Sequence, residues 1–392
     1  MSKRKTKDGR SRLRLLWLSD SPACTTGLGR ATSQILARLH ATGRYDILAR
    51  GWGHNAASQP QALSYRVEPA QAGPEDARSM AAAIKQFKPD VVVTFGDPWH
   101  FAWLSDTPGF DASRWVGYFP IDAGPLAAEW KSVVASAAWV AAPSEFSLGV
   151  LRLAVPNAKT RLIPHGVDLS VFHPLEDRRP GAVQRCHSSE FVVGFVGRNQ
   201  PRKQIPTLVR AFASFSRGRS DAFLYLHTAP VDLGWDVPAL IAHNNLQGQA
   251  TACERVSGGV GVSDVELNEI YNSLDVLVQP SSGEGFGLPT LEAMAAGTPV
   301  VATDASANRE LVGGRGELIR VRSWGSRDGT RIPSPDEGHL VEILERLYSS
   351  GALRQRCSSA GLEFAQGMGW GPAASRWDEL IQEAAGLQPA AA

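Results

Sequence analysis

The segment from residue 276 to residue 303 limits the possible folds of this chain more than any other part. Its apolar ends, Val276–Gln279 and Val300–Thr303, are typical of buried parallel strands. Between them, a glycine-rich turn precedes Pro289, which suits the first turn of a helix, and Gly297, which suits the left-handed position after a helix end. The enclosed helix has about two turns and needs packing to be stable. The segment therefore predicts a strand, loop, helix and strand of one parallel sheet.

Strands and helices alternate along nearly the whole chain, which predicts an α/β architecture with parallel sheets. Because 392 residues exceed one ordinary core, we expect two domains of similar size. In the first half we expect strands at Leu13–Leu18, Tyr45–Ala49, Val91–Thr94, Trp115–Tyr118, Trp139–Ala142 and Thr160–Ile163, and helices at Leu28–Leu39, Met80–Phe87 and Ser144–Leu153.

The second half repeats this plan without an internal sequence repeat. We expect strands at Phe191–Val196, Phe223–His227, Val276–Gln279 and Val300–Thr303, and helices at Thr207–Phe215, Ser263–Ser273, Pro289–Ala296 and Leu340–Leu347. The polar stretch Arg322–Gly338 is expected to be an irregular surface loop. The prolines and clustered charges of Asp168–Glu190 predict an interdomain linker. The expected division is a leader at 1–12, domains at 13–175 and 190–366, and a last helix at 367–387.

Composition excludes some classes of protein. A hydrophobic content of 43% and a charged content of 20% are typical of a globular protein, and no apolar run is long enough for a membrane span. The four cysteines lack metal-ligand spacing, so we expect reduced thiols in a cytoplasmic protein. Peripheral attachment to a membrane is left open. Residues 3–14 carry seven basic side chains against one acidic one. They form either a solvated leader or an arm for a polyanion or membrane surface.

The glycine-rich turn carries the clearest chemistry. Gly285, Phe286, Gly287 and Leu288 place backbone amides at a helix N-terminus, where phosphate groups bind. Glu284 and Glu292 lie eight positions apart on either side of the helix start, and carboxylates are natural acceptors for paired sugar hydroxyls. These groups together favour a nucleotide sugar. The alternative is that the acids only stabilise the positive end of a helix.

The stretch E-G-F-G-L-P-x-L-E-A-M-A-x-G-x-P-V-V resembles the donor signature of the retaining glycosyltransferases of family 4. The resemblance is strong from Phe191 to about Leu311. It implies the GT-B fold, with two Rossmann-like domains facing a cleft and a C-terminal helix crossing back to the first. It also implies that Glu292 binds ribose hydroxyls, while Glu284 and the amides of Phe286 to Leu288 hold the hexose and phosphate.

Two cations follow the first strand of the second half. Arg198 offers a planar fork and Lys203 a point charge, and both suit a diphosphate. The family carries an arginine and a lysine at these places, which implies that Arg198 and Lys203 stabilise the leaving group. Arg202 is interpreted as a solvated neighbour. Because fixed cations replace a metal in this role and no Asp-x-Asp motif is present, we expect neither a metal nor a cofactor.

Other site residues are expected from the same resemblance. The loop before Ser263, including Val262, would give backbone contacts to the nucleotide base, which stays unspecified. Gly27 and Gly29 open the first helix and would face the donor, or they form a plain tight turn. Asp122 follows a strand of the first domain, where many relatives have a His-Asp pair. It would reach the sugar or acceptor, although Ile121 replaces the histidine, and helix capping is the alternative.

Aromatic and polar residues in the first domain are candidates for the acceptor pocket, because flat rings stack on sugars and bases. The alternative is that they are core aromatics. These candidates are Asp97, Trp99, His100, Trp52 and His54. His165, within a Pro-x-Gly-Val-Asp-like segment, is interpreted as structural.

The expected activity is transfer of a sugar from a nucleotide diphosphate sugar to an acceptor hydroxyl, with retention of configuration and without a metal. The acceptor stays open among glycan, lipid, small molecule, protein and modified nucleic acid. The alternatives are another GT-B activity, either a sugar-nucleotide epimerase or a phosphorylase, or a non-catalytic protein that binds nucleotide sugars. No nucleophile for double displacement is evident, so attack on the same face as the leaving group is favoured.

Overall fold

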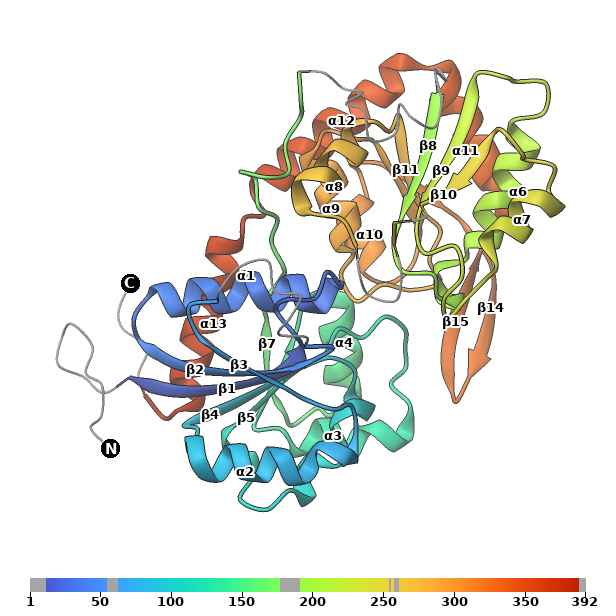
Figure 1. Cartoon of the computed structure of the whole chain (residues 1–392). Helices are drawn as coiled ribbons and strands as arrows, with labels where there is room; N and C mark the ends of the chain where they lie inside the picture. The colour runs from blue at the N-terminus through green and yellow to red at the C-terminus, as the bar shows by residue number, and fades with distance from the viewer. Residues whose placement is uncertain (1–11, 55–62, 177–190, 254, 257–260, 388–392) are drawn as a thin grey trace. The chain divides into compact units, whose positions relative to one another are not determined.

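The computed structural model describes residues 12–54, 63–176, 191–253, 255–256 and 261–387. The chain divides into two compact units. The first unit comprises residues 1–165, 328–330 and 370–392, and the second comprises residues 166–327 and 331–369. Figure 1 shows a layer of strands with helices on both faces in each unit. Within the described residues, no helix has the length and apolar character that crossing a bilayer requires.

The first unit contains a seven-stranded parallel sheet in the order β3-β2-β1-β4-β5-β6-β7. Its strands are β1 (Leu13–Asp20), β2 (Tyr45–Trp52), β3 (Arg66–Pro69), β4 (Val91–Phe95), β5 (Trp115–Tyr118), β6 (Trp139–Ala142) and β7 (Lys159–Leu162). The central strands read as apolar runs because helices cover both of their faces.

Successive side chains of β1 point to opposite faces of the first sheet. Leu16 and Leu18 belong to a core cluster with side chains of α2 (Ala77–Phe87), α3 (Lys131–Ser136) and α4 (Glu145–Ala154). Trp17, between them, contacts Trp377 of the last helix, α13 (Trp370–Ala384), which packs beside α1 (Gly27–Ala41). The alternation follows from the two-residue period of a strand. It explains why a helix from the end of the chain completes the first unit.

The second unit contains a six-stranded parallel sheet in the order β10-β9-β8-β11-β12-β13. Its strands are β8 (Phe191–Val196), β9 (Ala222–His227), β10 (Ala250–Ala252), β11 (Val276–Gln279), β12 (Val300–Thr303) and β13 (Glu317–Ile319). One core cluster joins this sheet to α6 (Ile205–Phe215), α7 (Val237–His243) and α11 (Glu337–Ser349). A second layer contains α8 (Asp264–Asn272), α9 (Leu288–Ala295), α10 (Ser306–Val312) and α12 (Gly351–Gln366).

The boundary between the units lies at residues 165 and 166, ten residues before the expected position at 175. The reason is a set of hydrogen bonds that ties residues 166–176 to the second unit. Asn268 Oδ1 accepts from the backbone N of His173 at 3.2 Å, and Asn272 Oδ1 accepts from the backbone N of Leu175 at 2.9 Å. The rest of the expected linker, residues 177–190, lies outside the described residues.

The prediction of an irregular loop at Arg322–Gly338 is wrong. The chain there forms a hairpin of β14 (Val321–Arg327) and β15 (Thr330–Pro335), followed by the start of α11. Asp328 and Gly329 connect the strands with φ values of 52° and 78°. Positive φ at both central residues matches the tight turn that Asp-Gly favours in hairpins. That dipeptide was the overlooked sequence signal.

Both large sheets reverse their strand order at one point, between β1 and β4 in the first unit and between β8 and β11 in the second. In doubly wound sheets of this kind, ligands bind outside the carboxyl ends of the strands at this reversal. The expected architecture of two parallel, Rossmann-like sheets is confirmed. The loops after β8 and β11 therefore mark the place to look for a site in the second unit.

Candidate functional site

The loops after β8 and β11 meet at the carboxyl edge of the second sheet. The backbone N of Ser282 donates to the carbonyl of Arg202 at 2.7 Å, and Gln204 Nε2 donates to Ser282 Oγ at 2.9 Å. The strands that precede these loops are neighbours in the sheet. Segments about 80 positions apart in sequence are therefore joined by the strand order.

A buried carboxylate lies at the centre of this junction. Lys203 Nζ is 2.6 Å from Glu284 Oε1, and the exposed fractions of the two side chains are only 8% and 9%. Arg202 Nη1 lies 3.1 Å from Glu284 Oε2 and donates to the carbonyl of Gly283 at 2.8 Å. We call Glu284, Lys203 and Arg202 the Glu284 cluster. Its carboxylate has one cation at each oxygen.

The charge state of Glu284 follows from two opposed effects. Burial raises its pKa, but the positive charges of Arg202 and Lys203 and the hydrogen bond from Lys203 outweigh burial and lower the pKa to about 2. Glu284 is therefore ionised near neutral pH. An ionised carboxylate accepts hydrogen bonds but cannot donate one. Glu284 is therefore suited to binding hydroxyl groups and not to acting as a general acid.

Hydrogen bonds to the segment that follows β12 fix the backbone of Glu284. The backbone N of Glu284 donates to Ser306 Oγ at 2.9 Å, and its carbonyl accepts from the backbone N of Ala307 at 3.3 Å. Ser306 and Ala307 begin α10, directly after β12. Sequence reasoning missed Ser306, because nothing in its local pattern distinguishes it from any serine at a helix start.

The expected helix after the glycine-rich turn is present as α9. Gly287 precedes it with a φ of 107°, Pro289 lies in its first turn, and Gly297 after its end has a φ of 73°. Phe286 and Leu288 beside Gly287 are buried. The turn thus directs the N-terminus of α9 toward the edge that holds Glu284, and Gly285 lies in the same turn.

Glu292 lies within α9 and is 3% exposed. Tyr271 Oη donates to Glu292 Oε2 at 2.9 Å, and the carbonyl of Tyr271 accepts from Thr298 Oγ1 at 2.7 Å. Tyr271 therefore links α8 to the start of the β12 segment and positions the Glu292 carboxylate. Sequence reasoning missed Tyr271, because it lies 21 residues from its partner.

The two other cations after β8 each have an acidic partner. Arg202, interpreted as a solvated neighbour, is 39% exposed, but it also pairs with Glu284 and donates to the carbonyl of Gly283. Arg198 Nε is 2.9 Å from Asp232 Oδ2, and its side chain is 43% exposed. The structure therefore pairs Lys203 directly with Glu284 and holds Arg198 beside Asp232, from the loop after β9.

In the first unit, Gly29 is required by its surroundings. A Cβ atom there would lie 2.6 Å from the carbonyl oxygen of Cys24 and 2.7 Å from that of Ser21. Gly27 is the first residue of α1, and Thr26 caps that helix by accepting from the backbone N of Gly29. Close packing within the loop thus accounts for Gly29, and the proposal that Gly27 and Gly29 face a donor stays a prediction.

Asp97 and Asp122 both lie at the carboxyl edge of the first sheet. Asp97 follows β4 and precedes a short 3-10 turn. Asp122 follows β5 by four positions, next to Ile121, whose carbonyl accepts from Ser147 Oγ at 2.6 Å. Neighbouring strands β4 and β5 thus bring both acids to one edge.

Three of the acceptor candidates, Trp52, His100 and Trp99, form one aromatic group. Trp52 and His100 have ring centroids 5.0 Å apart, and Trp99 contacts His100 at 5.4 Å. Trp52 is 9% exposed and its indole N donates to the carbonyl of Gln71, so it serves the core, whereas Trp99 is 45% exposed. His54 Nδ1 lies 3.0 Å from Ser21 Oγ.

Several expected features lie at or beyond the edge of the described residues. Residues 1–11 of the leader lie outside the described residues. Arg14 lies in β1, and its Nη2 is 3.0 Å from Asp90 Oδ1. In the loop expected to contact the base, residues 257–260 lie outside the described residues. Val262 is described and lies directly before Ser263, which caps α8. Among the described residues, no three histidine, cysteine or acidic side chains gather as metal ligands would.

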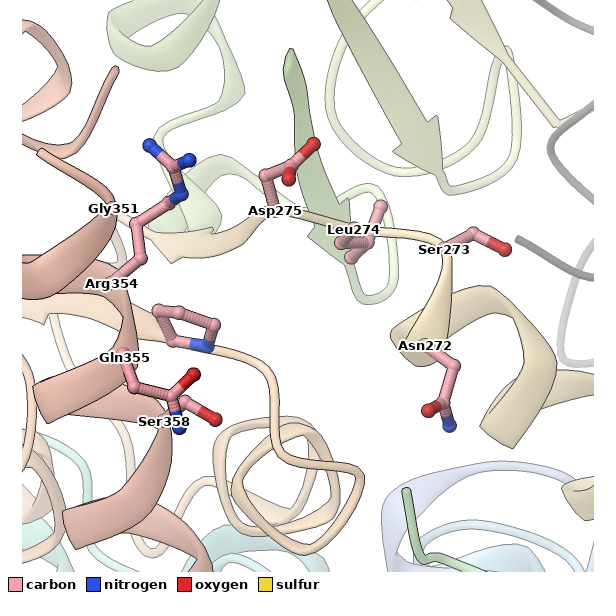
Figure 2. Close-up of a pocket in the computed structure, with 9 residues that line it drawn as sticks. Asn272, Ser273, Leu274, Asp275, Gly351, Arg354, Gln355 and Ser358 are labelled. Carbon is pink, nitrogen blue, oxygen red and sulfur yellow. The ribbon is translucent and has the colours of Figure 1, made fainter. Parts of the chain in front are cut away.

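A separate cavity of about 250 Å³ lies at the opposite, amino edge of the second sheet. Figure 2 shows its lining, which includes Asn272, Asp275 and Arg354. Asp275 Oδ2 accepts from the backbone N of Val192 at 2.8 Å, and Asn272 holds the segment around Leu175. These polar groups hold neighbouring structural elements together. Because the cavity lies at the other edge of the sheet, it is distinct from the Glu284 cluster.

Part of the sequence matches a known protein family. The family model for glycosyl transferases group 1 matches residues 190–350. A curated relative, D-inositol 3-phosphate glycosyltransferase of Arthrobacter sp. (strain FB24), is 29% identical over 345 residues, which cover 81% of this chain and 76% of that protein.

Two solved structures resemble the whole chain. Sucrose-phosphate synthase of Thermosynechococcus elongatus has a TM-score of 0.76 at 21% identity and covers 95% of this chain and 99% of its own. The HepE protein of Anabaena, in complex with UDP and glucose, has a TM-score of 0.72 at 18% identity and covers 95% of this chain and 100% of its own. At these identities the likeness establishes the fold, which is GT-B.

Proposed function

We propose that the chain is a group 1 glycosyltransferase that uses a nucleotide sugar donor, and that its second unit binds the donor at the Glu284 cluster. The observation that carries this proposal is the ionised, buried Glu284 between Lys203 and Arg202. It lies at the carboxyl edge of the sheet, where the strand order reverses. A doubly wound sheet binds its ligand there.

In this proposal the donor diphosphate lies beside Lys203 and Arg198. Lys203 pairs with Glu284, and the diphosphate would share its ammonium group. The Nε atom of Arg198 is paired with Asp232, but a guanidinium has further N–H donors for a phosphate. The amides of Phe286, Gly287 and Leu288 at the start of α9 would add partial positive charge.

The two glutamates would hold the two sugars of the donor. Glu284, as an ionised acceptor, would bind hydroxyl groups of the transferred sugar, together with Gly285. Glu292, positioned by Tyr271, would bind the ribose hydroxyls. Val262 would contribute backbone contacts to the base. Because solved structures of the HepE protein contain UDP and glucose or UDP-glucose, a uridine donor is the first to test.

The proposed reaction keeps the configuration of the sugar and needs no metal. The acceptor oxygen forms a bond to the anomeric carbon on the face from which the diphosphate leaves. The bond from that carbon to the phosphate oxygen breaks, and the acceptor proton passes to the departing phosphate. Lys203, Arg198 and the amides of the α9 start stabilise the negative charge on the leaving group. Glu284 takes no part as an acid because it is ionised.

The acceptor would bind the first unit. Asp122 and Asp97 supply carboxylates at the carboxyl edge of the first sheet, and exposed Trp99 offers a ring face beside His100. A phosphate-bearing polyol is a reasonable first acceptor to test, since the curated relative is named for an inositol 3-phosphate.

The experiment combines calorimetry and turnover. Purified protein is titrated with UDP, GDP and ADP, and then with their glucosyl or mannosyl esters, before products are analysed with and without acceptors. We expect the wild type to bind at least one diphosphate. We expect Glu284→Ala to lose turnover by about a hundredfold or more, as for a group that contacts the reacting sugar. Glu342→Gln, which changes an exposed acid of the same unit, serves as the matched control and should keep wild-type rates.

Three outcomes would contradict the proposal. Well-folded protein that binds no nucleoside diphosphate would remove its basis, and full activity in Glu284→Ala would remove the site assignment. Conversion of the donor without any acceptor would indicate an epimerase, and a requirement for inorganic phosphate would indicate a phosphorylase. Binding without any turnover would leave a nucleotide-sugar-binding protein.

A further inference from the structure

The β14–β15 hairpin carries an exposed tryptophan. Trp324 is 49% exposed, and the guanidinium carbon of Arg331 lies 4.5 Å from its ring centroid. Because strand side chains alternate between faces, Arg322 shares the face of Trp324, while Arg327 points to the other. We call Arg322, Trp324 and Arg331 the Arg-Trp face.

The hairpin begins at the same edge of the sheet as the Glu284 cluster. Strand β13, which precedes it, is parallel to β12, with Ile319 opposite Thr303. The connection after β12 supplies Ser306, which bonds to the backbone of Glu284. Since β12 alone separates β13 from β11, the ends of β11 and β13 lie about 10 Å apart. The base of the hairpin is therefore near the loop that holds Glu284.

The charge of this segment is one-sided. Residues 320–336 contain four arginines and two aspartates. Arg320 lies near Asp336, whereas Arg331 lies over the ring of Trp324 and Arg322 shares that face of the strand by alternation. A planar guanidinium suits carboxylate, phosphate or sulfate groups, and an indole ring suits the flat C–H face of a sugar.

We propose that the Arg-Trp face binds an anionic glycan. This inference goes beyond the proposed function, because the Arg-Trp face includes none of the residues proposed to hold the donor or the acceptor. Sugar rings would stack on Trp324, and their acidic groups would pair with Arg322 and Arg331. Nucleic acid fits less well, because the whole chain has a net charge of +1 and a pI of about 7.8, far below the basic balance typical of nucleic-acid-binding domains.

The test is retardation in native gels containing polygalacturonate, with dextran as the neutral sugar polymer and oligothymidine as the non-glycan polyanion. We expect polygalacturonate to retard the wild type and dextran to do so far less. Trp324→Ala should weaken binding about tenfold, and Arg322→Ala by several-fold, with a smaller salt dependence. Trp324→Phe, which keeps an aromatic ring, should restore most of the binding.

Arg327→Ala is the matched control, because it removes an exposed arginine from the opposite face of the same hairpin. Binding within about twofold of the wild type is expected for this control. Equal losses in Arg327→Ala and Arg322→Ala would overturn the face assignment. No retardation by polygalacturonate, or tighter binding to oligothymidine that Trp324 also controls, would overturn the ligand class.

Calorimetry of donor binding separates this inference from the proposed function. Trp324→Ala should bind nucleoside diphosphate as the wild type does, because the hairpin face does not include the Glu284 cluster. Unaltered glycan retardation in Trp324→Ala, with normal donor binding, would sink the glycan proposal alone. Loss of nucleotide binding in the wild type would sink the proposed function instead. A fall in melting temperature without a change in glycan binding would reduce Trp324 to a structural role.

Discussion

Glu284 is a residue whose behaviour depends on its neighbours more than on its own chemistry. Buried alone, a carboxylate would be driven toward its neutral form. Lys203 and Arg202 reverse that tendency, and the pKa falls to about 2. The same cations would attract a diphosphate. The carboxylate proposed to bind the sugar therefore pairs with the cation proposed to bind the diphosphate.

At this scale we predict a strong coupling between Lys203 and Glu284. Lys203→Met should lower the free energy of unfolding of the second unit by about 2–3 kcal/mol, because it leaves a buried carboxylate with Arg202 as its remaining cation. Adding Glu284→Gln should recover part of that loss while leaving activity absent. Urea unfolding of both single variants and the double variant measures the coupling, and purely additive effects would contradict it.

His165 gives a prediction for pH. Burial lowers its pKa from 6.5 to about 3, so the folded protein keeps it neutral while the unfolded chain takes up a proton. Stability should therefore be complete above about pH 6.5 and decline as the pH falls toward 3. Between about pH 7.5 and about pH 5, the wild type should lose about 2 kcal/mol more than His165→Asn. Urea unfolding at both pH values checks this, and parallel losses would refute it.

At the scale of elements, the turn before α9 determines the direction of the helix. Gly287 has a φ of 107°, and a Cβ there would lie 3.3 Å from Leu311 Cδ1. Gly314, after α10, has a φ of 78° but open space around the same atom. The two glycines therefore form a matched pair for separating backbone strain from disturbance of the site.

We predict that Gly287→Ala and Gly314→Ala each lower stability by about 1–2 kcal/mol, because each forces alanine into a left-handed conformation. Only Gly287→Ala should also weaken nucleotide binding, by about tenfold or more, since its Cβ would shift the loop that carries Glu284. Thermal unfolding and calorimetry measure the two effects. Equal nucleotide binding in both variants would argue against a role for the turn in donor binding.

At the scale of the whole molecule, the first unit is built from both ends of the chain. Trp377 of α13 is fully buried, with its ring 4.9 Å from the rings of Trp17 and Tyr118. Tyr45 Oη donates to the carboxylate of Asp378 in the same helix. The last helix thus fills the face of the first sheet that α1 leaves uncovered.

Trp377→Ala should therefore destabilise the first unit by about 3–5 kcal/mol, through the cavity that it leaves. Arg376→Ala, next to it on the exposed side of α13, should have little effect. Differential scanning calorimetry should show the transition of the first unit shifted and that of the second nearly unchanged. A shift of both transitions to the same extent would mean that the units unfold together.

The sequence predicted the strands and helices whose patterns are local and strong. Phe191–Val196, Val276–Gln279 and Val300–Thr303 were placed to the residue, because buried parallel strands are continuous apolar runs. The hairpin at Val321–Pro335 was missed, since β14 is exposed, β15 contains two prolines and only the Asp-Gly turn marks the pair. Helix α12 was missed because its weakly patterned sequence is stabilised by packing against α9.

By itself, the sequence determined the α/β class, the glycine-rich turn and the candidates Glu284, Glu292, Arg198 and Lys203, because these depend on residue type and short spacing. Tertiary structure decided which of them meet. Lys203 and Glu284 are 81 positions apart, and they come together only because β8 and β11 are neighbours where the strand order reverses. The same adjacency turned Arg202 from a presumed solvated residue into a partner of Glu284, and no local pattern carries that information.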